Sequence, residues 1–314
     1  DAGFTTVFSA GDSLQDIIEL RQRLQKGEVK GPRLIVSGRV QLARQGGGTA
    51  GGAGGGAGRG RAGGPGGDPA RFDVSRPPLR PTQAAAGIPA ADTIAAVEAL
   101  AKAGVDAIKT AIITTPGGPE KETLALIVRE GKRHSIPTVT HAVSVLDTLA
   151  AVDAGVASLV HTPHIGRLEE DAAAIQKIAK SGIPMMSTLG IFIPYFDADN
   201  KPLFRDRGPF PMIETLSSGG QGPVNARLLW EAGITYGYGT DSSWLQKDAL
   251  AQELRALHLM FSAKDIVTIL TRNAAATILR SDTLGTLEAG KIADMVILNG
   301  DPLANVSNLL NVAI

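Results

Sequence analysis

Four polar side chains that can take part in catalysis stand at the ends of short apolar runs in this chain. They are Lys109 after 105–108, His141 after 137–140, His161 after 158–160 and Asp241 after 234–240. Each run has the apolar or β-branched composition of a strand. In a βα barrel the C-terminal ends of the strands face the active site. The sequence therefore predicts that these four side chains meet at one rim of the fold.

These residue types point to metal chemistry. Two histidines at consecutive strand ends favour metal binding over the simpler alternative of two buried, hydrogen-bonded rings. Asp241 is expected to be a metal ligand or general base, although it could instead cap the next helix. A buried ammonium on Lys109 is unfavourable unless it is paired or deprotonated, and a neutral lysine can add carbon dioxide to become a carbamate bridge between metals. His164 follows His161 in a loop, where it is either a substrate contact or a surface residue.

A strand–helix repeat must position these residues. Helical segments end on a glycine and turn directly into a strand at Gly104, Gly155, Gly182 and Gly233, as a βα repeat requires. Strands are predicted near 4–8, 33–37, 105–109, 136–141, 157–161, 184–189 and 234–239. We therefore predict an α/β fold, a TIM-like (β/α)8 barrel, with seven of the eight strands of a closed barrel. Residues 284–298 alternate turn residues with an apolar strand and predict a hairpin of a separate small β unit.

A glycine tract interrupts the repeat. Between Gly46 and Gly67, 14 of 22 residues are glycine, and such a segment buries little surface, so we expect a mobile loop. The match to G-x-G-x-x-G at 58–63 carries little weight, because no strand leads into it and no helix follows. An Arg-Gly segment could bind RNA, but a solvated linker is the preferred interpretation.

The composition excludes several classes of protein. Lys and Arg number 31 and Asp and Glu number 31, so the total charge gives no reason to expect nucleic acid or an anionic membrane as partner. The chain has no cysteine, which excludes disulfides and thiolate metal sites. Any metal must therefore be held by histidine, carboxylate or modified lysine. Neither a membrane-spanning run nor a signal-like leader is visible in the sequence.

Taken together, the strand-end residues and the motifs at 271–275 and 284–294 resemble the metal-dependent amidohydrolase superfamily, in particular its imidazolonepropionase-like and prolidase-like branch. The resemblance implies a TIM-like barrel with one or two divalent metals, commonly zinc, and a β-sandwich built from both chain ends. By position, His141 and His161 would hold the second metal and Lys109, as a carbamate, would bridge. Asp241 would bind the first metal and take the proton from the attacking water.

The sequence departs from that family at its beginning. The family's first strand carries a His-x-His pair, and no His-x-His occurs here. The opening residues resemble the second strand, so we expect the first strand and half of the sandwich to lie upstream of Asp1. The expected domains are a barrel at 1–280, with a flexible insertion at about 44–82, and part of the composite sandwich at 281–314.

The expected function is metal-dependent hydrolysis of an amide or other C–N bond in a dipeptide, cyclic amide or related small substrate. The alternative is an inactive amidohydrolase-like protein that binds a partner through the Arg-Gly-rich loop. The expected partners are a small molecule or short peptide, without nucleic acid or membrane, and homo-oligomers are open. The expected location is the cytoplasm, or the periplasm or exterior if a leader was removed upstream of Asp1.

If the glycine tract is only a linker, shortening 46–67 to a few residues should leave the melting temperature and the metal content almost unchanged. The reason is that the entropy of closing a long loop varies slowly with its length. Differential scanning calorimetry and metal analysis of the shortened protein provide the test. A large loss of folding would show that the tract packs against the domain.

Overall fold

The computed structural model describes residues 2–44, 83–190, 221–241 and 246–313. Its centre is one parallel sheet of seven strands that pair in the order of the sequence. The strands are β1 Thr6–Ser9, β2 Arg33–Arg39, β3 Ala107–Ala111, β4 Thr138–His141, β5 Ser158–Val160, β6 Met185–Met186 and β7 Tyr236–Gly237. The seven predicted strands are therefore confirmed, and their parallel order is the order of a βα barrel.

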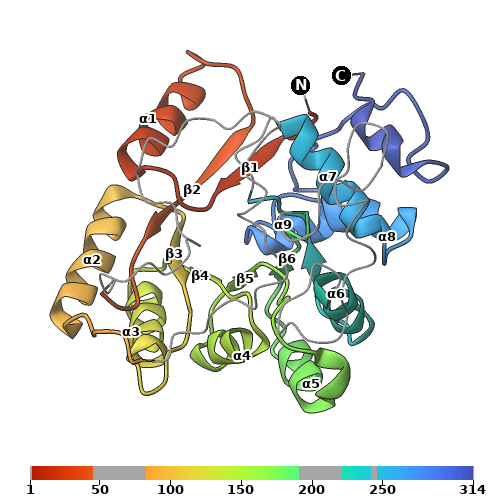
Figure 1. The fold of residues 1–314 in the computed structure, drawn as a ribbon. Helices are drawn as coiled ribbons and strands as arrows, with labels where there is room; N and C mark the ends of the chain where they lie inside the picture. Colours follow the sequence, from red (N-terminus) through yellow and green to blue (C-terminus); the bar gives the residue numbers. More distant parts are fainter. Residues whose placement is uncertain (1, 45–82, 191–220, 242–245, 314) are drawn as a thin grey trace, which may run out of the picture.

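Helices cover the outside of this curled sheet (Figure 1). The helices are α1 Leu14–Gln25, α2 Ala90–Ala103, α3 Glu120–Arg133, α4 Val145–Ala154, α5 Ala172–Lys180, α6 Gln221–Glu231, α7 Gln246–His258, α8 Ala263–Thr268 and α9 Ala274–Thr277. Gly104 and Gly155 end α2 and α4 with φ of 68° and 70°. This left-handed conformation is favourable only for glycine, so the predicted helix-to-strand punctuation is confirmed at both positions.

The two faces of the sheet pack differently. Side chains that alternate along the strands divide into an outer set, which packs under the helices, and an inner set, which fills the barrel. The outer set includes Ile108, Leu159, Met185 and Tyr236, and the inner set contains Ala107, Val139, Val160 and Met186. A dry apolar layer therefore lies directly beneath the C-terminal rim of the barrel.

β1 and β7 are the two edges of the sheet. Side chains bring these edges together, because the Phe4 and Tyr238 rings stack with their centroids 5.5 Å apart. The two ends of the described chain also lie side by side. A Cβ at Gly3 would come within 2.9 Å of Val312 Cγ2 and 3.2 Å of Val296 Cγ1.

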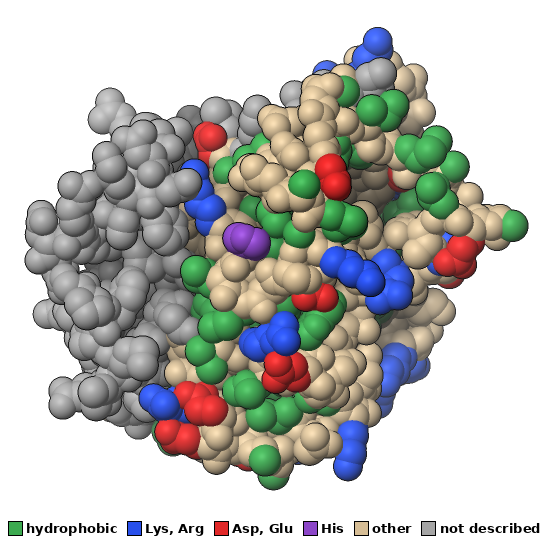
Figure 2. Space-filling model, turned by 90° about the vertical axis from the view of Figure 1, so that its right-hand side faces the viewer, with side chains coloured by type: hydrophobic (Ala, Val, Ile, Leu, Met, Phe, Trp, Pro, Cys, Tyr) green, Lys and Arg blue, Asp and Glu red, His purple; other side chains and the backbone are tan. Residues whose placement is uncertain are grey.

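The predicted hairpin at 284–298 is not formed. The described residues 281–313 contain turns, the short 3-10 helix Val306–Leu310 and one antiparallel bridge between Leu298 and Val312, and no strand of a β-sandwich. Gly285, with φ of 91°, turns this segment against the α9 region, where a Cβ would meet Ala275 Cβ at 2.6 Å. The apolar residues that suggested a strand are exposed, namely Leu287, Met295 and Ile297. Hydrophobic side chains are also interspersed with charged ones on the face of the molecule in Figure 2. An apolar run without a neighbouring strand to pair with gives no sheet, whatever its periodicity.

The predicted insertion falls largely outside the described residues, but its two ends are held together. Arg44 N donates to Ala86 O at 2.8 Å in an isolated antiparallel bridge. Arg44 and Ala86 therefore lie side by side. Among the described residues no helix is long and apolar enough to span a bilayer.

Asp106 ties several elements together just before β3, at the end of the barrel away from the rim. Its carboxylate accepts hydrogen bonds from Arg21 at 3.0 Å, from Arg280 at 2.8 Å and from the Val36 amide at 2.9 Å. These partners belong to α1, β2 and the segment after α9. One carboxylate thus fixes early and late parts of the chain relative to each other.

Replacing Asp106 with Ala should lower the free energy of unfolding by about 2–3 kcal/mol. The carboxylate loses three charge-assisted hydrogen bonds, but its side chain is 24% exposed, so solvent screening makes the total smaller than the sum for three buried bonds. Urea denaturation measures the effect. Asp153→Ala is the matched control, since Asp153 pairs with Lys177 at 2.6 Å on the exposed surface and should change stability by less than about 1 kcal/mol. Equal effects of the two substitutions would contradict the role of Asp106.

Candidate active site

Lys109 and His141 project into the barrel from neighbouring strands. Lys109 lies two residues after the inward-facing Ala107, and His141 lies two residues after the inward-facing Val139. Because side chains alternate along a strand, both point to the inner face. Lys109 is 8% exposed and its Nζ donates to Thr110 O at 3.2 Å. His141 is the last residue of β4, as the sequence predicts, whereas β3 continues two residues beyond Lys109.

His161 reaches the same place by a different route. It follows the inward-facing Val160, so simple alternation would point its ring outward. Its φ of 79° is in the left-handed region, which breaks the alternation at the end of β5. The ring then packs edge-on against His141, with the centroids 4.4 Å apart. The local backbone, and not the strand period, thus brings the two imidazoles together.

Asp241 closes the group from the end of β7. Its Oδ2 lies 3.6 Å from His161 Nε2, and its side chain is 54% exposed. Asp241 also has a positive φ, of 47°. Non-glycine residues rarely adopt this conformation, and they concentrate at functional sites. Lys109, His141, His161 and Asp241 thus share one rim, as the sequence predicts.

Burial sets the charge of the basic groups. Burial lowers the pKa of Lys109 to about 8, against the opposing effect of Asp241. Burial also lowers the pKa of His141 to about 3, and that of His161 well below 6.5. Both rings are therefore neutral at pH 7, which is the form that binds metals. Burial raises the pKa of Asp241 above 3.8, while Lys109 and then Arg39 act to lower it.

His164 is held beside the pair by a buried amide. Asn225 of α6 donates to Pro163 O at 2.8 Å and to Gly166 O at 3.0 Å, and accepts from the Leu168 amide at 3.1 Å. This side chain fixes the loop that carries His164. His164 is 7% exposed, and burial lowers its pKa to about 4. The surface interpretation of His164 is therefore wrong, while a substrate contact stays a prediction.

The sequence interpretation missed three residues of this rim. Arg39 ends β2, and its charge acts on both Lys109 and Asp241. Thr188 lies against His161, with 2.6 Å between Oγ1 and Nδ1. Glu253 of α7 is 1% exposed and holds the loop after β6. Arg39 could have been found by extending the predicted strand by two residues, whereas Thr188 and Glu253 carry no sequence signal.

The donor set fits a divalent metal. Within the described ranges, no three His, Asp or Glu side chains already converge as a metal-binding group. His141 Nε2 is nevertheless buried without a hydrogen-bond partner, and a buried polar atom of this kind calls for an explanation such as a bound ion. The 3.6 Å between His161 Nε2 and Asp241 Oδ2 is close to the roughly 3.3 Å between two ligands of one tetrahedral zinc.

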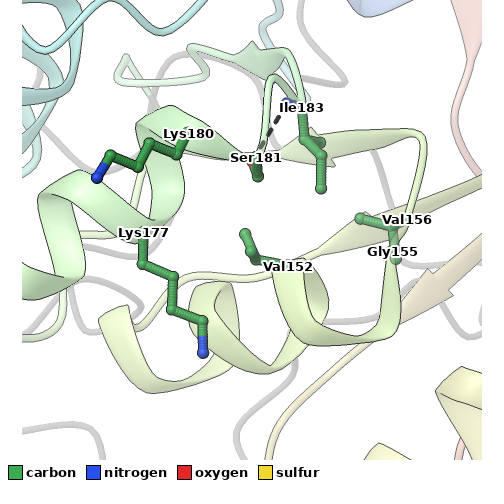
Figure 3. Close-up of a pocket in the computed structure, with 7 residues that line it drawn as sticks. All are labelled: Val152, Gly155, Val156, Lys177, Lys180, Ser181 and Ile183. Carbon is green, nitrogen blue, oxygen red and sulfur yellow. Dashed lines mark hydrogen bonds between the residues drawn. The ribbon is translucent and has the colours of Figure 1, made fainter.

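A surface depression of about 600 Å³ lies elsewhere on the molecule, between α4 and α5 (Figure 3). It is lined by Val152, Gly155, Val156, Lys177, Lys180, Ser181 and Ile183. Val156 and Ile183 precede β5 and β6, so the depression is at the N-terminal end of the barrel. It is therefore separate from the rim that carries the histidines.

A curled parallel sheet whose C-terminal rim gathers two imidazoles, a carboxylate and a lysine has the arrangement in which βα barrels place their active sites. Residues 1–313 match the model of the Amidohydrolase family. The chain belongs to the amidohydrolase family, whose members are generally metal-dependent.

Similar proteins support the imidazolonepropionase-like and prolidase-like branch of this family. The chain is 27% identical to an imidazolonepropionase of Thermoanaerobacter pseudethanolicus over 187 residues, which cover 58% of this chain and 39% of the relative. The match thus spans about two fifths of that relative's length. A solved Xaa-Pro dipeptidase with bound methionine is similar in fold, with a TM-score of 0.70 and 23% identity, over 99% of this chain and 73% of that one. An ochratoxinase of A. niger has a TM-score of 0.67 and 18% identity, over 99% and 70%.

The pKa of Glu253 gives a prediction for stability. Burial raises this pKa from 4.5 to about 7. Between these pH values Glu253 holds a proton in the folded protein and releases it in the unfolded chain. The contribution of Glu253 to the free energy of unfolding therefore falls as the pH rises. The change amounts to about 3 kcal/mol. Glu253→Gln cannot titrate and should lack this dependence.

Urea denaturation of the chelator-treated protein at several pH values between 4.5 and 8 provides the measurement. The free energy of unfolding of the wild type minus that of Glu253→Gln should fall by about 3 kcal/mol over this range. Glu130→Gln, which alters a buried carboxyl of α3 that pairs with Arg133, is the control. A difference that stays constant with pH would contradict the raised pKa.

Proposed function

We propose that the protein is a metal-dependent hydrolase that cleaves an amide or related C–N bond of a small substrate. The observation that carries this proposal is the pair of neutral imidazoles of His141 and His161, whose ring centroids are 4.4 Å apart. Asp241 Oδ2 lies 3.6 Å from His161 Nε2. Burial keeps both rings in the form that donates a lone pair. Membership of the amidohydrolase family supports the same reaction class.

His141, His161 and Asp241 would hold the metal, with zinc as the preferred ion because nitrogen and carboxylate ligands suit it. A bound divalent ion supplies two things, an acidified water and a polarised carbonyl. The apolar layer formed by Val139, Val160 and Met186 beneath the rim would lower the local dielectric on the inner side of the two imidazoles, which strengthens their electrostatic interactions.

Asp241 would act as the proton carrier. Its carboxylate lies at the open end of the rim and is 54% exposed, so it can meet both substrate and the attacking water. It would take a proton from that water and deliver it to the leaving nitrogen, which then departs as a neutral amine.

Lys109 is proposed to become a carbamate. Its pKa of about 8 leaves a fraction of neutral amine at pH 7, whose nitrogen can attack carbon dioxide and release a proton. The product is an anion on the inner face beside His141. A carbamate anion there would compensate the positive charge of a bound metal ion, whereas a protonated lysine would repel that ion.

The substrate class is proposed from the relatives. They include a Xaa-Pro dipeptidase and an imidazolonepropionase, so dipeptides and cyclic amides are the first substrates to test. A panel of both, assayed for released amine or acid, separates them. The alternative, an inactive binding protein using the Arg-Gly-rich segment, predicts no turnover of any member of this panel and no stoichiometric zinc.

Replacing Lys109 with Ala or Arg should remove most of the metal and abolish activity. Arginine keeps the positive charge but cannot form the carbamate, so it should be at least as damaging as alanine. Short carboxylic acids should partly rescue Lys109→Ala by supplying the missing anion. Metal analysis by mass spectrometry and amide hydrolysis are the readouts.

Lys177→Ala is the matched control, since this lysine is exposed on α5 and pairs with Asp153. It should keep full metal content and activity. Normal activity together with full metal occupancy in Lys109→Arg would contradict the bridging role.

A further inference from the structure

We propose that Thr188 is a positioning residue for His161, and that Glu253 holds Thr188 in the backbone conformation this requires. The hydroxyl of Thr188 would fix the tautomer and orientation of the His161 ring. The orientation is argued from the geometry alone, while its consequence for metal binding rests on the proposed function. Thr188 acts through His161 and is not placed in contact with substrate.

The contact that carries the proposal joins two fully packed side chains. Thr188 Oγ1 lies 2.6 Å from His161 Nδ1, and each residue is 1% exposed. With Nδ1 engaged by a hydroxyl, Nε2 is the nitrogen that faces Asp241. The hydrogen bond made by one ring nitrogen decides which nitrogen is available to a ligand. A threonine hydroxyl can donate or accept, so the distance fixes the ring but not the proton. The proposal is that the hydroxyl accepts from Nδ1–H, which leaves the lone pair of Nε2 facing the rim.

Thr188 occupies an unusual backbone conformation to make this contact. Its φ is 46°, which is rare and strained for a β-branched residue. Glycine would adopt the same φ without this cost but offers no hydroxyl. Gly239 of the neighbouring segment leaves room for the side chain, because a Cβ there would lie 3.2 Å from Thr188 Cγ2.

The surrounding backbone holds this conformation from two sides. The Thr188 amide donates to Gly239 O at 3.0 Å. The next two amides, of Leu189 and Gly190, donate to Glu253 Oε1 at 3.0 Å and Oε2 at 2.6 Å. A side chain whose two oxygens accept two consecutive amides fixes both peptide planes, since hydrogen bonds are directional.

Glycine is also needed where the loop meets α7. A Cβ at Gly190 would lie 3.0 Å from Glu253 Oε2 and 3.1 Å from Gln252 Cγ. Gln252 donates back to Gly190 O at 3.4 Å. The connection therefore runs from a helix on the outside of the barrel, through three loop residues, to one imidazole at the rim.

The test follows the ring directly. With histidine labelled by ¹⁵N, two-bond ¹H–¹⁵N spectra of the metal-free protein report the tautomer of each of its five histidines, and His161→Gln assigns the signal. We expect the Nδ1–H tautomer in the wild type and in Thr188→Ser, which keeps the hydroxyl. Thr188→Val should give a mixture of tautomers, and its zinc affinity should fall by about 10- to 100-fold.

Two further variants keep the test decisive if Thr188→Val folds poorly. Thr188→Gly lacks the hydroxyl but relieves the backbone strain, so it should fold and show the same mixture of tautomers. Glu253→Gln replaces an acceptor with a donor facing an amide, so it should reproduce the change in the His161 signal, whereas Glu130→Gln should not.

An Nε2–H tautomer in the wild type, or an unchanged Nδ1–H tautomer in both Thr188→Val and Thr188→Gly, would overturn the positioning role. A lost tautomer preference with unchanged zinc affinity would instead support the positioning role and contradict the proposed ligand role of His161. The two failures are therefore distinguishable. A changed signal in Thr188→Val but not in Glu253→Gln would overturn the part of the proposal that assigns Glu253.

Discussion

The site depends on two imidazole rings that are kept neutral and close together at the edge of a dry barrel. Protonating either ring would place positive charge beside the other ring and beside Lys109, which is why burial and these neighbours all lower the pKa of the pair. The apolar layer inside the barrel and the outer helices both contribute to the burial that lowers these pKa values. Each neutral ring keeps a nitrogen lone pair, and the other rim residues lie around these nitrogens.

The strand pattern and the glycine punctuation make much of this fold predictable from the sequence. Seven short β-rich runs separated by helices allow little besides a parallel βα sheet, and the position of Lys109 and His141 on the inner face follows from alternation. The hairpin at 284–298 could not be judged in this way. Its apolar residues have the period of a strand, but a strand exists only where a partner offers hydrogen bonds.

Other parts of the site depend on conformations that no residue pattern specifies. His161, Thr188 and Asp241 all have positive φ, and none is the glycine that would have announced it. Glu253 is distant in sequence from the residues it holds, and its helix reads as an ordinary amphipathic segment. Tertiary packing stabilises these local conformations, so the second layer of the site becomes visible only in three dimensions.

The central claim is that the rim binds a catalytic metal through His141, His161 and Asp241. Anomalous diffraction at the zinc absorption edge, on crystals of the zinc-loaded protein, tests it most directly. The account predicts a peak about 2.0–2.2 Å from His161 Nε2, with His141 and Asp241 as further ligands. An active protein without a peak at this rim, or with its zinc bound elsewhere, would contradict the account.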